Sequence, residues 1–226
     1  MEYAEVVLVI PAYNEEKTIG RVVAELREQF QDKIGIIVVS DASTDNTAAI
    51  AKSSGSTVIE LSENHGYAGA LSVGMSAAYN KMRAKYVVTM DADGQHPVAS
   101  VNKVVSMLWN MEAPTIDLIV GRRPYFARFS ERIYSLYFSL FYNVMDPLCG
   151  LKAYSDRLYH KLGTIETYDS IGSQMVIVAK KNKMNVVQVN ILLNEREDEP
   201  RFGGLFKANW RILTSLVKTI NYSISK

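Results

Sequence analysis

Short apolar runs alternate with amphipathic stretches along the first half of the chain. Each run is continuously apolar, which is typical of a strand buried on both faces of a parallel sheet. Such runs predict strands at 5–10, 34–40, 56–61, 85–91 and 116–121. Between them, apolar residues recur about every three to four positions, as on one face of a helix. That spacing predicts helices over 19–30, 46–54, 67–82 and 97–111.

Regular alternation of strands and helices indicates an α/β fold with a mostly parallel sheet and helices on both faces. In such sheets ligands bind at the carboxyl ends of the strands. Asp41, Asp91 and Gly121 all fall at those ends, as does the loop 11–16. We therefore expect the functional site along that edge of the sheet.

The alternation breaks down after residue 122. The stretch 126–145 is rich in aromatic residues, and the pattern further on predicts a helix over 171–181 and a strand over 184–193. Residues 205–226 predict an amphipathic helix with its apolar residues on one side: Leu205, Phe206, Trp210, Leu213, Leu216, Val217 and Ile220. We predict one domain over 1–204, with halves 1–123 and 124–204, followed by the helical segment 205–226.

Composition narrows the class of protein. The chain has 226 residues, 48% of them apolar, and a net charge of +1, so nothing indicates a nucleic-acid-binding protein. Cys149 is the single cysteine, which excludes a disulfide within the chain and fits a reducing compartment. The N-terminal residues do not resemble a signal peptide, and no apolar stretch reaches the roughly 18 residues of a membrane span. We expect a cytoplasmic protein.

The loop after the first strand differs from the common phosphate-binding loops. It reads PAYNEE over 11–16 and contains neither G-x-G-x-x-G nor G-x-x-x-x-G-K-[ST]. A bulky acidic loop suits a base or a ribose better than a pyrophosphate, with Tyr13 for stacking and Glu15 as an acceptor for hydroxyl groups. Helix capping is the alternative, and it accounts for Asn14 and Glu16 but not for Tyr13. Asp41 either accepts hydrogen bonds from a base or ribose, or caps a turn.

Two carboxylates, Asp91 and Asp93, follow the fourth strand. Like charges this close destabilise each other unless a cation lies between them or one holds a proton. Mg²⁺ or Mn²⁺ typically binds one or two carboxylates and completes its shell with substrate phosphates. Asp93 with Gln95 or His96 could supply the protein ligands, and Asp91 could orient a ribose or sugar. The alternative is a solvated turn.

Taken together, these segments resemble the family 2 glycosyltransferases with the GT-A fold. The matching motifs occur in order: VIPAYNEEKTI (9–19), VVSDASTDNT (38–47), NHGYAGALSVG (64–74), MDADGQHP (90–97), VGRR (120–123) and DPLCGLKAYS (146–155). Within the family, the chain is most similar to the dolichyl-phosphate mannosyltransferase and polyprenyl-phosphate sugar transferase group. Cys149 replaces the Ser or Thr of that group's D-x-x-[ST]-G-[FY]-[KR] segment. The stretch REDEPRFGG resembles its R-x-x-G-x-S-K loop only loosely.

The resemblance implies a role for each matching position. The nucleotide sugar would be held by Pro11, Tyr13, Glu15 and Asp41, with Asp91 on the nucleotide or sugar. A divalent metal ion, Mg²⁺ or Mn²⁺, would be bound by Asp93 and Gln95. The acceptor phosphate would face Arg122, Arg123, Arg132 and His96. A mobile loop over the diphosphate would carry Arg196 and Arg201.

The resemblance further implies inverting transfer of a hexose from GDP-mannose, UDP-glucose or UDP-N-acetylglucosamine. A polyprenyl phosphate acceptor is already an oxyanion near neutral pH, with a second pKa of about 6, and needs no base. A hydroxyl acceptor needs a positioned carboxylate. Residues 170–186 contain no Asp or Glu, which favours the phosphate. Two alternatives remain: a soluble transferase for a saccharide or other hydroxyl acceptor with Asp169 as base, and an inactive nucleotide-sugar-binding module.

The aromatic run 134–142 and the segment 205–226 admit three arrangements. A helix with Trp and Leu on one face and Lys and Arg on the other can lie on a membrane surface. The same stripes can pack onto the protein's own core or form a homodimer. The sequence leaves all three open.

Overall fold

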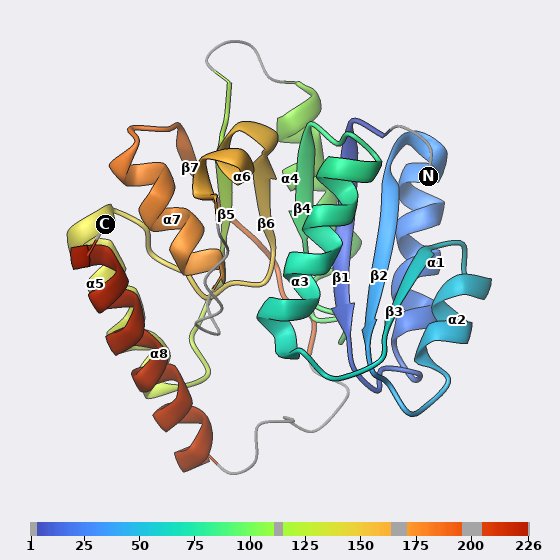
Figure 1. The fold of residues 1–226 in the computed structure, drawn as a ribbon, viewed down its shortest axis with the longest axis horizontal. Helices are drawn as coiled ribbons and strands as arrows, with labels where there is room; N and C mark the ends of the chain where they lie inside the picture. The colour runs from blue at the N-terminus through green and yellow to red at the C-terminus, as the bar shows by residue number, and fades with distance from the viewer. Residues whose placement is uncertain (1–3, 111–114, 164–170, 196–204, 226) are drawn as a thin grey trace.

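A seven-stranded sheet forms the centre of the computed structural model, which describes residues 4–110, 115–163, 171–195 and 205–225 (Figure 1). The strand order is β3-β2-β1-β4-β6-β5-β7. Only β6 runs antiparallel to its neighbours, β4 and β5; the other described pairings are parallel. The strands are β1 (Val6–Ala12), β2 (Gly35–Asp41), β3 (Thr57–Leu61), β4 (Tyr86–Thr89), β5 (Leu118–Arg122), β6 (Lys152–Ser155) and β7 (Val186–Asn190).

The strands predicted from continuous apolar runs are confirmed. All residues of β1 and β2 are buried, because helices cover both faces of the sheet there. The helices are α1 (Ile19–Phe30), α2 (Thr47–Ser53), α3 (Gly66–Ser76), α4 (Val98–Trp109), α5 (Phe129–Tyr142), α6 (Asp156–Leu162), α7 (Ile171–Lys181) and α8 (Leu205–Ser225). A π-helical turn, Ala77–Lys81, continues α3, and a 3₁₀ turn, Gln31–Lys33, follows α1.

Two hydrophobic cores lie on the two faces of the sheet. Side chains alternate along β1, so Leu8 belongs to the core under α1, α2 and α4, and Val9 to the core under α3 and α5 to α8. Gly74 lets α3 approach β1 closely, because a Cβ at that position would lie 2.3 Å from Cγ1 of Val9. The predicted α/β class with helices on both faces is therefore confirmed.

Strand β6 and helices α5 and α6 give the second half of the chain its shape. Residues 152–155 insert as an antiparallel strand between β4 and β5, with Tyr86 opposite Ser155 and Thr89 opposite Lys152. The Ser155 hydroxyl then caps α6 by accepting the N–H of Leu158. The sequence pattern did not predict this strand, because four residues with a lysine among them show no clear period.

Helices α5 and α8 lie side by side and pack beside α7 (Figure 1). A hydrogen bond of 2.9 Å joins the hydroxyls of Tyr134 and Thr219 across their contact. The predicted C-terminal helix is confirmed, but its apolar side is divided: Leu216 is buried, whereas Trp210 and Val217 are exposed. Among the described helices, none is both long and apolar enough to cross a bilayer.

Candidate functional site

The carboxyl ends of three adjacent strands bring the predicted donor-side residues together. In the order β2-β1-β4, the loop after β1 lies between the ends of β2 and β4. Tyr13 follows the end of β1, Asp41 is the last residue of β2, and Asp91 comes two residues after β4. The expected edge of the sheet therefore carries all three side chains.

The loop after β1 is fastened to the start of α2. The backbone N–H of Glu15 donates to the Thr47 hydroxyl at 2.7 Å, and the Thr18 hydroxyl donates to the Glu15 carboxylate at 3.1 Å. Glu15 is buried by these contacts, while the Tyr13 ring is 42% exposed. These contacts give Glu15 a structural task in holding the loop, and the partly exposed Tyr13 lies two residues before it. Pro11, inside β1, is buried.

Asp41 is buried and organises the segment before α3. One of its carboxylate oxygens accepts the backbone N–H of His65 at 2.8 Å, and its carbonyl oxygen accepts the side-chain amide of Asn64 at 3.1 Å. Asp41 therefore links the end of β2 to the start of α3, and does not merely cap its own turn.

Asp91 contacts polar side chains from two segments, the loop after β4 and helix α3. Its Oδ2 lies 3.4 Å from Nε2 of His96, and the Tyr67 hydroxyl of α3 hydrogen-bonds to its carboxylate. Burial opposes the ionised form of Asp91, but His96 and Tyr67 outweigh it and hold the pKa below its ordinary value. These contacts favour the ionised form of Asp91.

The backbone of Gly150 lies against the carboxylate of Asp91. A Cβ placed on Gly150 would lie 2.3 Å from Oδ2 of Asp91, well inside van der Waals contact. The segment between α5 and β6 therefore passes directly over the carboxylate. Only glycine permits that approach, and the position was not among the predicted site residues.

His96 is buried and under-satisfied. Among contacts to the described residues, neither ring nitrogen makes a hydrogen bond of good geometry. Its Nε2 lies 3.4 Å from Oδ2 of Asp91 without meeting the geometry of a hydrogen bond. A buried imidazole with spare capacity for hydrogen bonds suits a polar ligand or a water beside Asp91.

Asp93 and Gln95 share one tight loop. The backbone N–H of Gln95 donates to Oδ1 of Asp93 at 3.1 Å, and Asn194, after β7, fastens the loop through the carbonyls of Gln95 and Gly94 at 2.9 and 3.0 Å. Asn194 was not predicted, because its partner lies a hundred residues away in the sequence. The carboxylate of Asp93 is half-buried.

The oxygen atoms that this loop offers suit a hard divalent cation whose remaining ligands come from the substrate's phosphates and from water. In the described part of the chain, no group of three or more His, Cys, Asp or Glu side chains could form a cage for a metal ion. A carboxylate from Asp93 and an amide oxygen from Gln95 would supply two oxygen ligands. Mg²⁺ typically binds through one or two carboxylates, with phosphate oxygens and water completing its shell.

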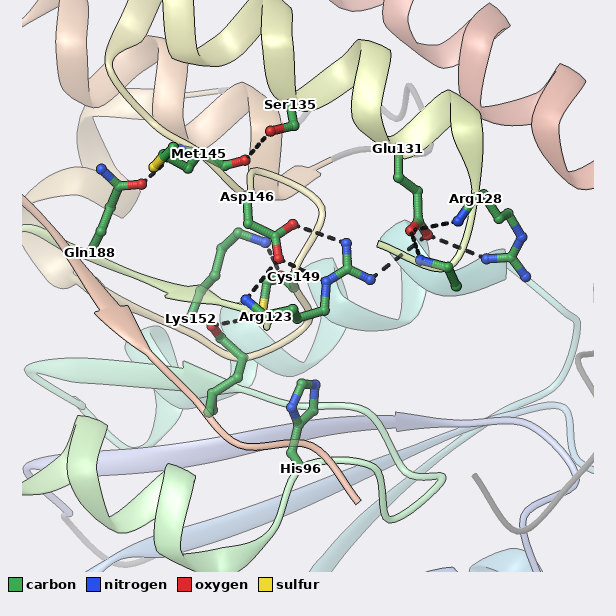
Figure 2. Close-up of polar contacts among 12 residues, drawn as sticks. His96, Arg123, Arg128, Glu131, Ser135, Met145, Asp146, Cys149, Lys152 and Gln188 are labelled. Carbon is green, nitrogen blue, oxygen red and sulfur yellow. Dashed lines mark hydrogen bonds and ion pairs between the residues drawn. The ribbon is translucent and has the colours of Figure 1, made fainter. Parts of the chain in front are cut away.

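The three arginines predicted to face the acceptor differ in their burial and contacts. Arg123 binds Asp146 through two hydrogen bonds of 2.8 and 2.9 Å, and its guanidinium also lies 3.7 Å from Glu131 (Figure 2). Burial alone would lower the pKa of Arg123, but Asp146 raises it well above its ordinary value. Arg123 is thus held within the protein, while Arg122, at the end of β5, and Arg132, on α5, are exposed.

Lys152 is a buried cation that sequence reasoning did not single out. It is 4% exposed, and its ammonium donates to the carbonyl oxygen of Cys149. Among the described residues, no carboxylate lies within ion-pair distance of it, and burial lowers its pKa although Asp91 and Asp146 favour the charged form. No local signal in the sequence singled it out, because Lys152 begins a short strand that the pattern did not predict. Asp169, Arg196 and Arg201 lie outside the described residues.

Comparison with known proteins agrees with this geometry. A model of the family described as Glycosyl transferase family 2 matches residues 7–183. The chain is 32% identical over 216 residues to a UDP-N-acetylglucosamine–dolichyl-phosphate N-acetylglucosaminyltransferase of Methanococcus voltae, covering 81% of this chain and 83% of that protein. It is 26% identical over 209 residues to a dolichyl-phosphate hexose transferase of Haloferax volcanii, covering 88% and 87%.

Among solved structures, a similar fold is that of glucosyl-3-phosphoglycerate synthase from Mycobacterium tuberculosis in complex with Mn²⁺, UDP and glucosyl-3-phosphoglycerate. The TM-score is 0.76 at 21% identity, covering 97% of this chain and 80% of that one. This likeness supports the GT-A fold. With the family match over most of the chain, it leads to one conclusion: the protein belongs to glycosyltransferase family 2 and is a glycosyltransferase.

Proposed function

We propose that the enzyme transfers a hexose, with inversion, from a nucleotide diphosphate sugar to a polyprenyl phosphate of the dolichyl type. The observation that carries the proposal is that relatives matching more than 80% of both chains are named as transferases acting on dolichyl phosphate. Two acidic residues in the described part of the second half agree with it. Asp146 and Glu131 are both buried against arginines, so neither is placed to act as a base toward a hydroxyl group.

The donor occupies the edge formed by the ends of β1, β2 and β4. Tyr13 stacks on the base, Asp41 accepts from the base or ribose, and Asp91 contacts the ribose or sugar. The donor is a GDP- or UDP-activated hexose. The complexes of the M. tuberculosis synthase with Mn²⁺ and UDP-glucose support a divalent metal on the same fold.

Asp93 and Gln95 would hold Mg²⁺ or Mn²⁺ through their oxygen atoms. The bound ion would neutralise the negative charge that builds on the leaving diphosphate as the bond from the anomeric carbon to its oxygen breaks. Arg196 and Arg201 belong to the same side of the reaction in this proposal. Asp93 holds a fixed orientation because the Gln95 N–H donates to it.

The acceptor phosphate enters on the side of Gly150 and His96. One of its oxyanions attacks the anomeric carbon from the face opposite the diphosphate, and a phosphate near neutral pH needs no proton removed. Arg122 and Arg132 are the exposed cations that attract it, since guanidinium groups suit paired phosphate contacts. His96 offers a buried ring N–H to a phosphate oxygen.

The buried single cysteine fits a reducing compartment, so we place the enzyme on the cytoplasmic face of the membrane.

The test uses radiolabelled GDP-mannose, UDP-glucose and UDP-N-acetylglucosamine with a polyprenyl phosphate and Mn²⁺, followed by organic extraction. Label that enters the organic phase only when enzyme, metal and lipid are all present supports the proposal. Label confined to a water-soluble saccharide would favour the hydroxyl acceptor, with Asp169 as the residue to replace. Donor binding without any transfer or hydrolysis would indicate an inactive binding module.

We further infer that Lys152 serves the site and not the stability of the fold. Its ammonium holds the Cys149 carbonyl, and the next residue, Gly150, lies against Asp91. Replacing Lys152 with methionine should leave the melting temperature unchanged or higher, because a buried ammonium with one carbonyl partner is costly and methionine fills a similar volume. The turnover number should fall by about tenfold to a hundredfold as the carboxylate loses its exact placement. Thermal denaturation and steady-state kinetics measure the two effects. A lower melting temperature with full activity would contradict this role.

A further inference from the structure

Two exposed apolar stripes run along α5 and α8. Leu140 is 71% exposed, Trp210 64% and Ile224 79%, although each lies on a helix that packs against the protein. We call the exposed side of the two helices the outer face. Its large apolar residues are Phe129, Leu136, Leu140 and Phe141 on α5, and Trp210, Val217 and Ile224 on α8.

The stripes follow helical spacing and stand opposite the buried sides. On α5, Phe129, Leu136 and Leu140 fall on one line of the helix, whereas Tyr134 and Phe138 on the other side are fully buried. On α8, the exposed large apolar residues recur every seven positions, at 210, 217 and 224. The inner sides of α5 and α8 pack against each other and against α7. The outer residues therefore do not contribute to the hydrophobic core.

Charge distinguishes between the surfaces that could cover this face. Glu131 is the only acidic residue in 129–142 and 205–225, and it is buried against Arg123 and Arg128. Among the residues of the two helices whose exposure is described, the exposed charges are cationic: Arg132, Arg211 and Lys218. A second copy of the same face would bring these cations together, while an anionic lipid surface would meet both the cations and the apolar side chains.

The outer face is also connected to the acceptor side of the site. Helix α5 starts at Phe129, and Glu131 in its first turn contacts Arg123, which in turn binds Asp146 (Figure 2). Asp146 precedes the segment that carries Gly150 over Asp91. A surface on which α5 lies flat would therefore present its headgroup layer beside the predicted acceptor side.

We propose that the outer face of α5 and α8 docks on the surface of a bilayer containing anionic lipids, with the apolar stripes in the interfacial layer. The docking rests on the proposed function only in that a polyprenyl phosphate is held in such a bilayer. It brings the acceptor phosphate to Arg122 and Arg132. The cations select anionic headgroups, and Trp210 and Leu140 supply apolar contact.

Flotation with vesicles tests the proposal. Wild-type protein should float with vesicles of phosphatidylcholine mixed with phosphatidylglycerol, and much less with phosphatidylcholine alone. In the double variant Leu140→Ser/Trp210→Ser, the affinity for vesicles should fall by about tenfold or more, because two large apolar side chains are no longer transferred from water into the lipid. Leu192→Ser is the matched control, because Leu192 is 67% exposed but lies beyond β7, outside the outer face. The control should bind like the wild type, and all variants should keep the wild-type melting temperature.

Two further measurements separate the possible failures. Absence of vesicle binding, or equal loss in the Leu192→Ser control, would overturn the docking proposal. So would light scattering that shows a dimer which the double variant dissolves, with no binding to vesicles. Transfer to a short-chain, water-soluble polyprenyl phosphate should persist in the double variant. If vesicle binding is as expected but no polyprenyl phosphate accepts sugar, the proposed function fails and the docking face stands.

Discussion

Asp93→Ala should reduce metal-dependent sugar transfer by at least about a hundredfold, which is the size of loss typical of removing one group that stabilises charge in a transition state. The carboxylate is half-buried and sits at a loop, not in either hydrophobic core, so the fold should survive. The expected melting temperature is within a few degrees of the wild type. Initial rates over a Mn²⁺ titration measure the effect, and added metal should not restore the rate.

Asp93→Asn separates the charge of Asp93 from its role in the loop. The asparagine oxygen still accepts the N–H of Gln95, so the turn keeps its shape while the negative charge is lost. We expect this variant to be nearly as inactive as the alanine variant. Asp32→Ala, in the exposed turn after α1, should be fully active and serves as the control for loss of a surface carboxylate. Activity of Asp93→Asn near the wild-type level, or transfer by the wild type in metal-free buffer, would remove Asp93 as a metal ligand.

Gly150→Ala should reduce kcat/KM by about a hundredfold, because misplacing a reacting or orienting group by about 1 Å has effects of that size. The added methyl group would lie 2.3 Å from Oδ2 and 2.6 Å from Cγ of Asp91, so either the carboxylate or the segment before β6 must move. Overpacking of this kind typically destabilises the fold by about 1–3 kcal/mol. Steady-state kinetics and thermal denaturation on the same preparations measure both consequences.

A double-mutant cycle shows whether the methyl group acts through Asp91. If it does, Asp91→Ala and Asp91→Ala/Gly150→Ala should be equally inactive, because the clash disappears with the carboxylate. The melting temperature of the double variant should also lie above that of Gly150→Ala. Independent, additive losses from the two substitutions would show that Gly150 matters for another reason.

The donor side could be predicted because it depends on strand ends. In a parallel sheet, the last residues of neighbouring strands meet at one edge whatever the details of packing, so Asp41 and Asp91 were placed by the periodicity of the chain alone. Their partners were not. His65, just before α3, Tyr67 on α3 and Gly150, before β6, contact these carboxylates. A local sequence pattern cannot predict contacts between residues so far apart in the chain.

The sequence also could not show which arginines of the second half are exposed and which are held by a carboxylate. Arg122 and Arg123 are adjacent in the sequence, yet one is exposed at a strand end and the other is held by Asp146. The difference depends on a carboxylate 23 residues further along. Helix α8 shows that a stripe of apolar residues does not reveal which part of it meets the core. Its apolar residues span a wide arc, and α5 and α7 cover only one part of that arc.

The antiparallel strand β6 has a consequence for the order in which the polypeptide can fold. Strand β4 pairs with β1 on one side, but its other side is filled by residues 152–155. Until the ribosome has delivered those residues, a nascent chain holding β1 to β4 presents a bare hydrogen-bonding edge of apolar sequence. During that time the unpaired edge of β4 can pair with a strand of another nascent chain. A chain truncated near residue 145 would therefore aggregate and would not form an independent donor-binding unit.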